Sequence, residues 1–282
     1  MPIYEKSYLS WHGQLLQKPM TWLVIAKTGI RLAWRKSLGI ILFISFIPFF
    51  FRAGQIYIVS RFGDEEALMK MVRGIQIDAE FFMSFLKGQS FILLLLVIVV
   101  GAGLIANDRK FKALPIYFSK PVGFWDYIIG KLLVIGSYGM LITMIPALLL
   151  YLMRALLTQN TDFIQSFYWV PFSIVAWPLA ALLILGGLTL AVSAFSRGSR
   201  AASILLFSII YVPELLRAIL SRIPDIGLIS IHATLHQLGA IFFGAKHPYD
   251  FSNGWMVIVL LGICGLSLLI LKIKVRPTEI LS

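Results

Sequence analysis

Charged residues and cysteine are scarce in this sequence. Only 13% of the 282 residues are Asp, Glu, Lys or Arg, and 59% are apolar, whereas about a quarter of the residues in a soluble domain are charged. The mean hydropathy of +0.87 fits the same pattern. These values exclude a soluble globular protein and predict a chain that crosses a membrane several times. The single cysteine, Cys264, excludes an intrachain disulfide and a cysteine-based metal cluster.

The sequence also lacks a nucleotide-binding motif. A Walker A loop requires a glycine, four further residues, and then Gly-Lys followed by serine or threonine. Here Gly130 and Lys131 are followed by Leu132, and the preceding glycine, Gly123, lies seven residues before Gly130. If ATP drives this protein, another chain therefore binds the ATP and its Mg²⁺.

Residue patterns typical of catalytic and metal sites are absent as well. There is no Gly-x-Ser-x-Gly motif and no carboxylate cluster, so we expect no catalytic and no cofactor-binding residue. His232 and His236 are four residues apart and could share one face of a helix, but no HExxH-type glutamate stands between them. We expect packing or hydrogen-bonding roles for both histidines and no metal site.

Long apolar runs dominate what is present. A bilayer core about 30 Å thick requires about 20 apolar residues in a spanning helix. Six such runs predict an all-α membrane protein with a single transmembrane domain, residues 1–282, whose six-span core covers 37–275. The expected spans are 38–59, 89–106, 128–152, 170–195, 201–220 and 254–273.

Lysine and arginine are distributed unevenly between the connecting segments. With both termini in the cytoplasm, sixteen of the 25 Lys and Arg residues lie on the cytoplasmic side, eight lie outside, and Arg52 lies within the first span. Basic residues favour the cytoplasmic side of a membrane. The asymmetry predicts cytoplasmic termini and accounts for the net charge of +12 without a nucleic-acid partner.

Two segments beside the spans have distinctive patterns. In residues 18–36 the basic residues Lys27, Arg31 and Arg35 recur every four positions, which is typical of an amphipathic helix in the membrane interface. We expect a cytoplasmic N-terminus, residues 1–36, that contains this helix; a solvated extension of the first span is the alternative.

The segment 221–253 contains an apolar stretch that is too short to cross the bilayer and is interrupted by Pro224 and Gly227. Irregular backbone at membrane depth is tolerated only where it packs against protein. We therefore expect this stretch to enter the outer leaflet and return, as a re-entrant segment between the fifth and sixth spans.

Three charged residues lie in or near the predicted spans. Arg52, Glu214 and Arg217 are candidates for substrate contact or an outer gate. The alternative is an ion pair between Glu214 and Arg217, which are three residues apart on one helix, and an Arg52 that extends to the outer headgroups. An ion-coupled carrier requires buried acidic or histidine residues, and the central parts of these spans have almost none.

The segment 101–133, GAGLIANDRKFKALPIYFSKPVGFWDYIIGKLL, lies between the second and third spans. A glycine-rich span end is followed by Ile-Ala-Asn-Asp-Arg, then by Phe-Ser-Lys-Pro-Val, and finally by Tyr-Ile-Ile-Gly-Lys-Leu. This order resembles the permease subunits of ABC-2 type transporters. The chain departs from the family pattern at Asn107 and Asp108, where glutamate is common, and at 112–114, where Gly-Thr is frequent.

The resemblance implies the membrane subunit of an ATP-binding cassette exporter in the cytoplasmic membrane of a prokaryote. A coupling helix between the second and third spans would rest on a cytoplasmic ATPase subunit. A second copy of the chain, or a related permease, would complete the transport path. The residues that the resemblance assigns to ATPase coupling are Asn107, Asp108, Arg109, Lys110, Phe111, Lys112, Leu114, Tyr117 and Phe118.

In such a helix the charged residues would face the partner while Phe111, Leu114, Ile116 and neighbouring aromatic residues anchor it. Pro115 would cap or kink it, because proline has no amide donor. The simpler alternative is a loop kept basic for topology. Two other functions remain open: an ABC-type assembly that supports a cell-envelope machine without classical transport, and an ion-coupled secondary transporter. No residue pattern identifies the substrate.

Overall fold

A computed structural model describes residues 20–34, 36–62, 76–119, 122–158, 162–220, 222–223 and 225–275 of the chain. Predictions that concern residues 1–19, Arg35, Lys120, Pro121 and Pro224 lie outside these ranges.

Every regular element among the described residues is a helix, as predicted. The elements are α1 (Thr21–Ala33), α2 (Lys36–Phe62), α4 (Ala79–Gly101), α5 (Gly103–Lys110), α6 (Leu114–Phe118), α7 (Phe124–Ile142), α8 (Met144–Leu157), α9 (Asp162–Ser166), α10 (Val170–Phe195), α11 (Ser199–Ile219), the 3₁₀-helix η1 (Ile226–Ile229), α12 (Ile231–Phe243) and α13 (Asn253–Lys274).

Six helical stretches are long and apolar enough to cross a membrane, so the prediction of six spans is confirmed. They are α2, the continuous pair α4–α5, the pair α7–α8, α10, α11 and α13. The first, fourth, fifth and sixth agree with the predicted ranges to within about three residues at each end.

The predicted start of the second span, residue 89, is wrong by ten residues. The Asp78 side chain accepts a hydrogen bond of 3.0 Å from the Phe81 amide and caps α4 at Ala79. Lys87 interrupts the apolar run, which moved the predicted start too far along the chain. Gln89 is in fact buried, where it donates to the Ser45 carbonyl at 2.7 Å.

The third span is longer than predicted and broken in the middle. It begins at Phe124, ends at Leu157, and is interrupted at Thr143. The Thr143 hydroxyl donates to the Gly139 carbonyl at 2.8 Å, one turn earlier. A threonine hydroxyl that bonds back to its own helix is a common cause of local bending. Sequence hydropathy cannot show this break, because both halves are apolar.

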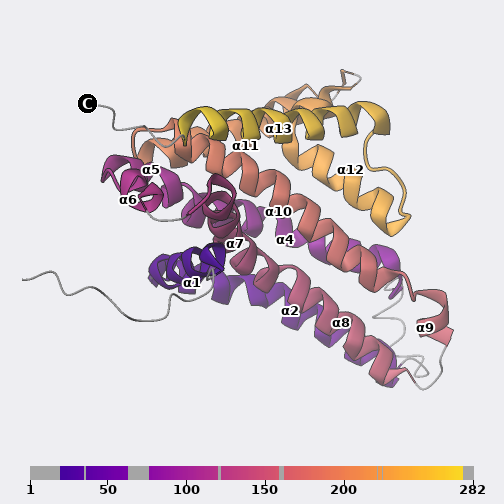
Figure 1. Cartoon of the computed structure of the whole chain (residues 1–282). Coiled ribbons are helices and arrows are strands. Elements are labelled where there is room, and N and C mark those ends of the chain that lie inside the picture. Colours follow the sequence, from indigo (N-terminus) through magenta and orange to yellow (C-terminus); the bar gives the residue numbers. More distant parts are fainter. Residues whose placement is uncertain are drawn as a thin grey trace, which may run out of the picture.

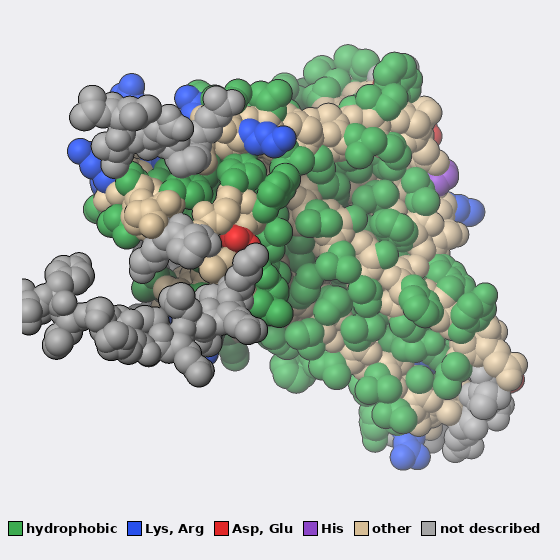
Figure 2. Space-filling model, in the orientation of Figure 1, with side chains coloured by type: hydrophobic (Ala, Val, Ile, Leu, Met, Phe, Trp, Pro, Cys, Tyr) green, Lys and Arg blue, Asp and Glu red, His purple; other side chains and the backbone are tan. Residues whose placement is uncertain are grey.

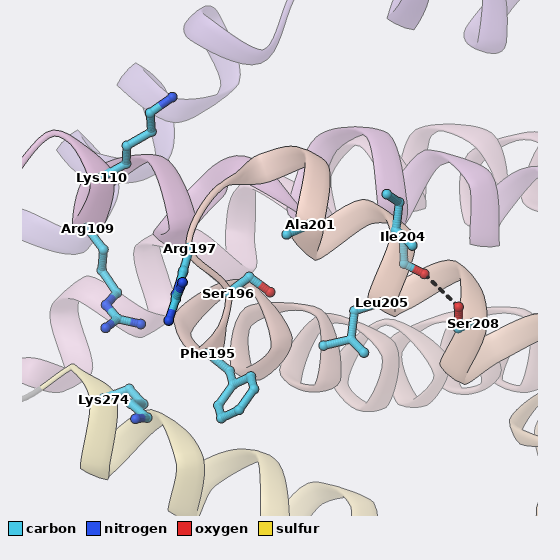
Figure 3. Close-up of a pocket in the computed structure, with 10 residues that line it drawn as sticks. All are labelled: Arg109, Lys110, Phe195, Ser196, Arg197, Ala201, Ile204, Leu205, Ser208 and Lys274. Atoms are coloured by element: carbon cyan, nitrogen blue, oxygen red, sulfur yellow. Dashed lines mark hydrogen bonds between the residues drawn. The ribbon is translucent and has the colours of Figure 1, made fainter.

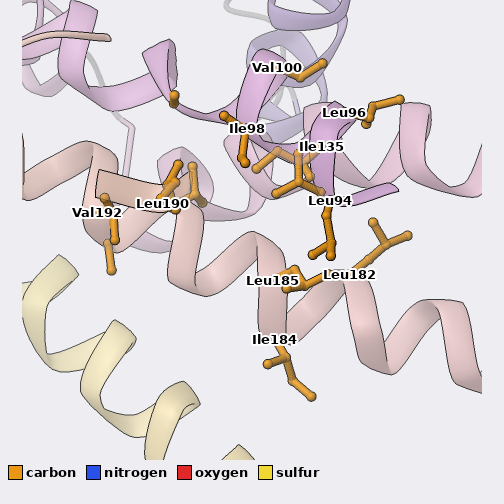
Figure 4. Close-up of a cluster of buried hydrophobic side chains, with 14 of the residues drawn as sticks. Leu94, Leu96, Ile98, Val100, Ile135, Leu182, Ile184, Leu185, Leu190 and Val192 are labelled. Carbon is orange, nitrogen blue, oxygen red and sulfur yellow. The ribbon is translucent and has the colours of Figure 1, made fainter. Parts of the chain in front are cut away.

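Two helices form the centre of the bundle and the others surround them. In the most apolar windows, 67% of the residues are buried in α4–α5 and 61% in α10, against 17% in α2 and 17% in α11. Figure 1 shows α2 and α8 on one side of this centre and α11 and α13 on the other. Figure 4 shows the central packing, where aliphatic side chains of α4, α7 and α10 interdigitate.

The first helix packs on α7 rather than presenting its whole apolar face to lipid. Gly130 of α7 is so close to α1 that an added Cβ would lie 2.8 Å from the Ile25 Cβ and 2.9 Å from the Trp22 carbonyl oxygen. The Tyr138 hydroxyl donates to the Ile30 carbonyl at 2.8 Å. Lys27 and Arg31 are exposed, and the third residue of the predicted basic face, Arg35, lies outside the described residues.

The stretch after α11 forms the short helices η1 and α12. Ser230 caps α12, because its hydroxyl accepts a hydrogen bond of 3.1 Å from the Ala233 amide. Most of α12 is buried, including His236 and Gln237. It packs against α4, α10, α11 and α13 and lies obliquely between α10 and α13 in Figure 1.

Candidate functional site

The residues predicted to couple to a partner lie at one end of the bundle. Figure 1 shows α5 and α6 at this end, close to the last turn of α13 and to α1. Figure 2 shows lysine and arginine side chains gathered around the same end, beside a largely apolar lateral surface. We call the stretch from Asn107 to Ser119 the α5–α6 segment.

Ser193 of α10 binds the backbone just before the α5–α6 segment. The Ser193 hydroxyl accepts hydrogen bonds from the amides of Ile105, at 3.0 Å, and Ala106, at 2.9 Å. The same hydroxyl donates to the Ala102 carbonyl at 2.8 Å. It lies at the interruption between α4 and α5, and side-chain insertion of this kind is a recognised cause of a helix kink. Ser193 therefore joins the end of the second span to α10.

A buried ion pair ties the α5–α6 segment to α7. The Lys131 ammonium lies 2.7 Å from an Asp108 carboxylate oxygen, and these side chains are only 7% and 17% exposed. The Tyr127 hydroxyl donates to the same carboxylate at 2.7 Å. Asp108 was predicted to face a partner chain, but its side chain faces this internal cluster. It holds the segment in place.

Aromatic rings complete the cluster beneath α6. The rings of Tyr117 and Phe118 pack on Tyr127 at centroid distances of 5.4 and 5.9 Å, and the Lys131 ammonium lies 5.7 Å from the Tyr117 ring centroid. Burial and the negative charge of Asp108 raise the pKa of Tyr117, so its phenol stays neutral at physiological pH. Leu114 also packs against the core.

The turn between α5 and α6 exposes another set of side chains. Lys112 has a left-handed backbone, with φ of 54°, and the Ala113 amide donates to the Asp108 carbonyl at 2.8 Å. Pro115 lies in the first turn of α6, so it starts a helix and does not kink one. Phe111, at the start of this turn, is 72% exposed, and Ile116, in α6, is 65% exposed. Both were predicted to anchor the segment, and both instead face outward.

Arg109 also bonds within the chain. Its guanidinium donates to the Ala194 carbonyl near the end of α10. It lines an open pocket of about 920 Å³ with Lys110, Arg197 and Lys274. The Asn107 side chain is half-buried and lines a second pocket, of about 510 Å³, with Asp108 and Lys131. Of the charged residues predicted for coupling, only Lys110 and Lys112 are exposed.

The charged residues Glu214 and Arg217 form the ion pair that was given as their alternative. The Arg217 Nη2 atom lies 2.6 Å from a Glu214 oxygen, and its Nε donates to the same carboxylate. The Ser230 hydroxyl also donates to Glu214, and His232 Nδ1 lies 3.8 Å from it. This cluster joins α11 to the start of α12.

Arg52 belongs to a different cluster. Its guanidinium donates to Gln55 Oε1 at 3.0 Å and to Ser84 Oγ at 2.8 Å. It also lies 4.7 Å from the Phe81 ring centroid. Arg52 therefore joins α2 to α4, and the structure does not bring it together with Glu214 and Arg217.

Among the described residues, no group of three or more His, Cys, Asp or Glu side chains could hold a metal ion. The His232 and His236 rings are in contact, with centroids 4.0 Å apart and ring planes tilted by 54°. His236 Nε2 lies 3.3 Å from the Ser90 hydroxyl.

Two residues of this site were present in the sequence pattern but not assigned a role. Tyr127 and Lys131 are in the Tyr-Ile-Ile-Gly-Lys-Leu stretch, and both bind Asp108. Lys131 could have been recognised from the sequence, because a charged residue near the start of an apolar span needs a polar partner there. Ser193 gave no signal, because serine is ordinary in an apolar helix and its partners lie far away in sequence.

Comparison with known protein families identifies the family of this chain. A sequence model described as "ABC-2 family transporter protein" matches residues 26–237. The match runs from within α1 to within α12 and includes the whole α5–α6 segment. No curated protein was found to match the chain.

Proposed function

The chain belongs to the ABC-2 transporter family, and we propose that it is the membrane subunit of an ATP-driven exporter whose ATPase is a separate chain. Permeases of this family have no nucleotide-binding domain of their own. The sequence has no Walker A motif that would supply one.

The observation that carries this proposal is that some side chains of the α5–α6 segment bond to the bundle while others are exposed to a partner. Asp108 and Arg109 bond inward, to Lys131 and to the Ala194 carbonyl. Phe111 and Ile116 are exposed at the end of the bundle, next to the cations Lys110 and Lys112. An exposed apolar pair on a rigid support is typical of a docking surface.

The same support would transmit movement. The segment is joined to α7 through Asp108 and to α10 through Arg109, and Ser193 of α10 binds the residues just before it. A rigid-body displacement of a docked ATPase would therefore move α7 and α10 together, as in a domain-level switch. Both helices belong to the buried core.

We place the α5–α6 segment and both termini on the cytoplasmic side of a prokaryotic cytoplasmic membrane. The excess of lysine and arginine in the segments at this end supports that orientation. We also propose a second copy of the chain, or a related permease, as partner. The low burial of α2 and α11 supports it, since both have apolar surface available for a further contact.

Co-purification with the ATPase subunit tests the proposal. Phe111→Ser with Ile116→Ser should lower the affinity for the ATPase at least tenfold, because exposed hot-spot side chains contribute about 2 kcal/mol or more each. Ile164→Ser with Tyr168→Ser is the matched control, since it removes two exposed apolar side chains near α9, at the other end of the bundle.

Undiminished co-purification of the Phe111 and Ile116 variant would refute docking at this surface. Transport by the chain alone, without any ATPase, would refute the ATP-driven function itself. Stimulation of ATPase activity by a substrate in the reconstituted complex distinguishes export from support of a cell-envelope machine.

A further inference from the structure

The pocket beside Arg109 is lined by basic and apolar residues that have no role in the proposed docking of an ATPase. It lies where the C-terminal ends of α5, α10 and α13 meet the first turns of α11. At about 920 Å³ it is within the usual size range of small-molecule sites. Figure 3 shows that Arg109 and Arg197 point toward the same space, with Lys274 facing it from α13, whereas Lys110 points away.

Within the part of the chain that the structure describes, no negative charge offsets these three cations. None of the pocket-lining residues is acidic, and among the described residues none of the three forms an ion pair. The two guanidinium groups and the ammonium repel one another. An anion between them would relieve that repulsion, and a phosphate group matches the geometry of arginine donors especially well.

The pocket also has an apolar wall that continues along the spanning helices. Phe195 is 61% exposed, and Ile204 on α11 is 69% exposed. The Lys274 ammonium lies 5.6 Å from the Phe195 ring centroid. Both α11 and α13 pack on α10, while α12 contacts both of them further along. The pocket therefore opens between two spanning helices, toward the lateral surface of the bundle.

We propose that this pocket binds one anionic phospholipid of the inner leaflet. The phosphate would lie between Arg109, Arg197 and Lys274, and the acyl chains would extend along the exposed apolar residues of α11 and α13. Basic pockets between spanning helices on the cytoplasmic side are suited to anionic headgroups. A soluble anion would gain nothing from the apolar wall, and an acidic segment of a cytoplasmic partner would have to enter between membrane helices.

Native mass spectrometry of the purified full chain tests this proposal, with dioleoyl phosphatidylglycerol and dioleoyl phosphatidylcholine as probes. We expect the anionic lipid to be retained preferentially. Arg197→Gln with Lys274→Gln should weaken its binding about 25-fold, since each basic side chain near a membrane surface contributes about a fivefold factor. Arg200→Gln with Lys272→Gln is the control, because it removes the same charges from the same region without touching the pocket.

A second variant leaves every charge in place. Ala201 is exposed and lines the pocket, so Ala201→Trp should block the site and reduce phosphatidylglycerol retention without depending on charge. Equal retention of the two lipids, or equal losses in the two double variants, would overturn the proposal. Displacement of phosphatidylglycerol by inorganic phosphate at similar concentration would assign the pocket to a soluble anion instead.

These measurements require no ATPase subunit. Their failure would leave the docking proposal standing, and failure of docking would leave the lipid site standing.

Discussion

The Lys131 ammonium and the Asp108 carboxylate are in direct contact, at 2.7 Å, although they belong to different spans. Both side chains are largely buried, and Tyr127 supplies a further hydrogen bond to the carboxylate. Because a buried charge is strongly destabilising without its partner, this pair fixes the position of the α5–α6 segment.

Removing both members of this pair should cost less than the sum of the two single removals. We expect Asp108→Asn or Lys131→Met alone to lower the free energy of unfolding by about 3 kcal/mol, because each leaves an uncompensated buried charge. The double variant should be less destabilised than the sum of the two. Thermal unfolding of the purified proteins measures this, with the exposed Lys112→Met as control. Strict additivity would show that the pair is not coupled.

The contact between α1 and α7 should be sensitive to a side chain at one glycine and not at another. Gly130→Val should displace α1 and cost about 1–3 kcal/mol, because its Cβ would overlap Ile25 and the Trp22 carbonyl oxygen. Gly136, on the same helix, has open space around its ideal Cβ. Protease accessibility of α1 and thermal stability compare Gly130→Val with Gly136→Val. Equal behaviour of the two variants would contradict the packing described here.

Ser193 should matter more than an ordinary serine in an apolar helix. Ser193→Ala leaves two amides and a carbonyl at the α4–α5 junction without this partner, so we expect a loss of about 1–3 kcal/mol. Ser208→Ala is the control, because its hydroxyl donates to the Ile204 carbonyl one turn earlier on the same helix. Chemical denaturation of the two variants side by side provides the measurement, and a Ser193→Ala variant as stable as wild type would be inconsistent with this role.

The Glu214 cluster should hold α12 in place. Glu214→Gln weakens its contacts with Arg217 and Ser230, and Ser230 is the N-cap of α12. We therefore expect faster amide hydrogen exchange across Ile231–Phe243 in this variant. Glu80→Gln is the control, since Glu80 is exposed in the first turn of α4. Unchanged exchange would mean that the buried face of α12 alone is sufficient to fix it.

The number of spans was predictable because a run of about 20 apolar residues has few other structures available to it in a membrane. The ends of the spans were less predictable. Lys87 lies inside α4 and interrupts its apolar run, so hydropathy alone placed the start of the second span too late.

The location of the candidate site was predictable from its sequence pattern, but the orientation of its side chains was not. Phe111 and Ile116 are apolar and were expected inside, whereas Asp108 and Arg109 are charged and were expected outside. The structure reverses both expectations, since Lys131 and the Ala194 carbonyl provide polar partners inside the bundle. The Ala194 carbonyl belongs to a span 85 residues further along the chain from Arg109, where the local pattern gives no sign of it.

Through the adjacent residues Gly130 and Lys131, one turn of α7 contacts both α1 and α5. Gly130 leaves no room between α7 and Ile25 of α1, and Lys131 holds Asp108 of α5. A displacement of α5 that shifts this turn by a fraction of an ångström therefore has to shift α1 as well. Since α1 precedes α2 in the chain, a movement of α5 would reach the first span through α7 and α1, without passing through α4.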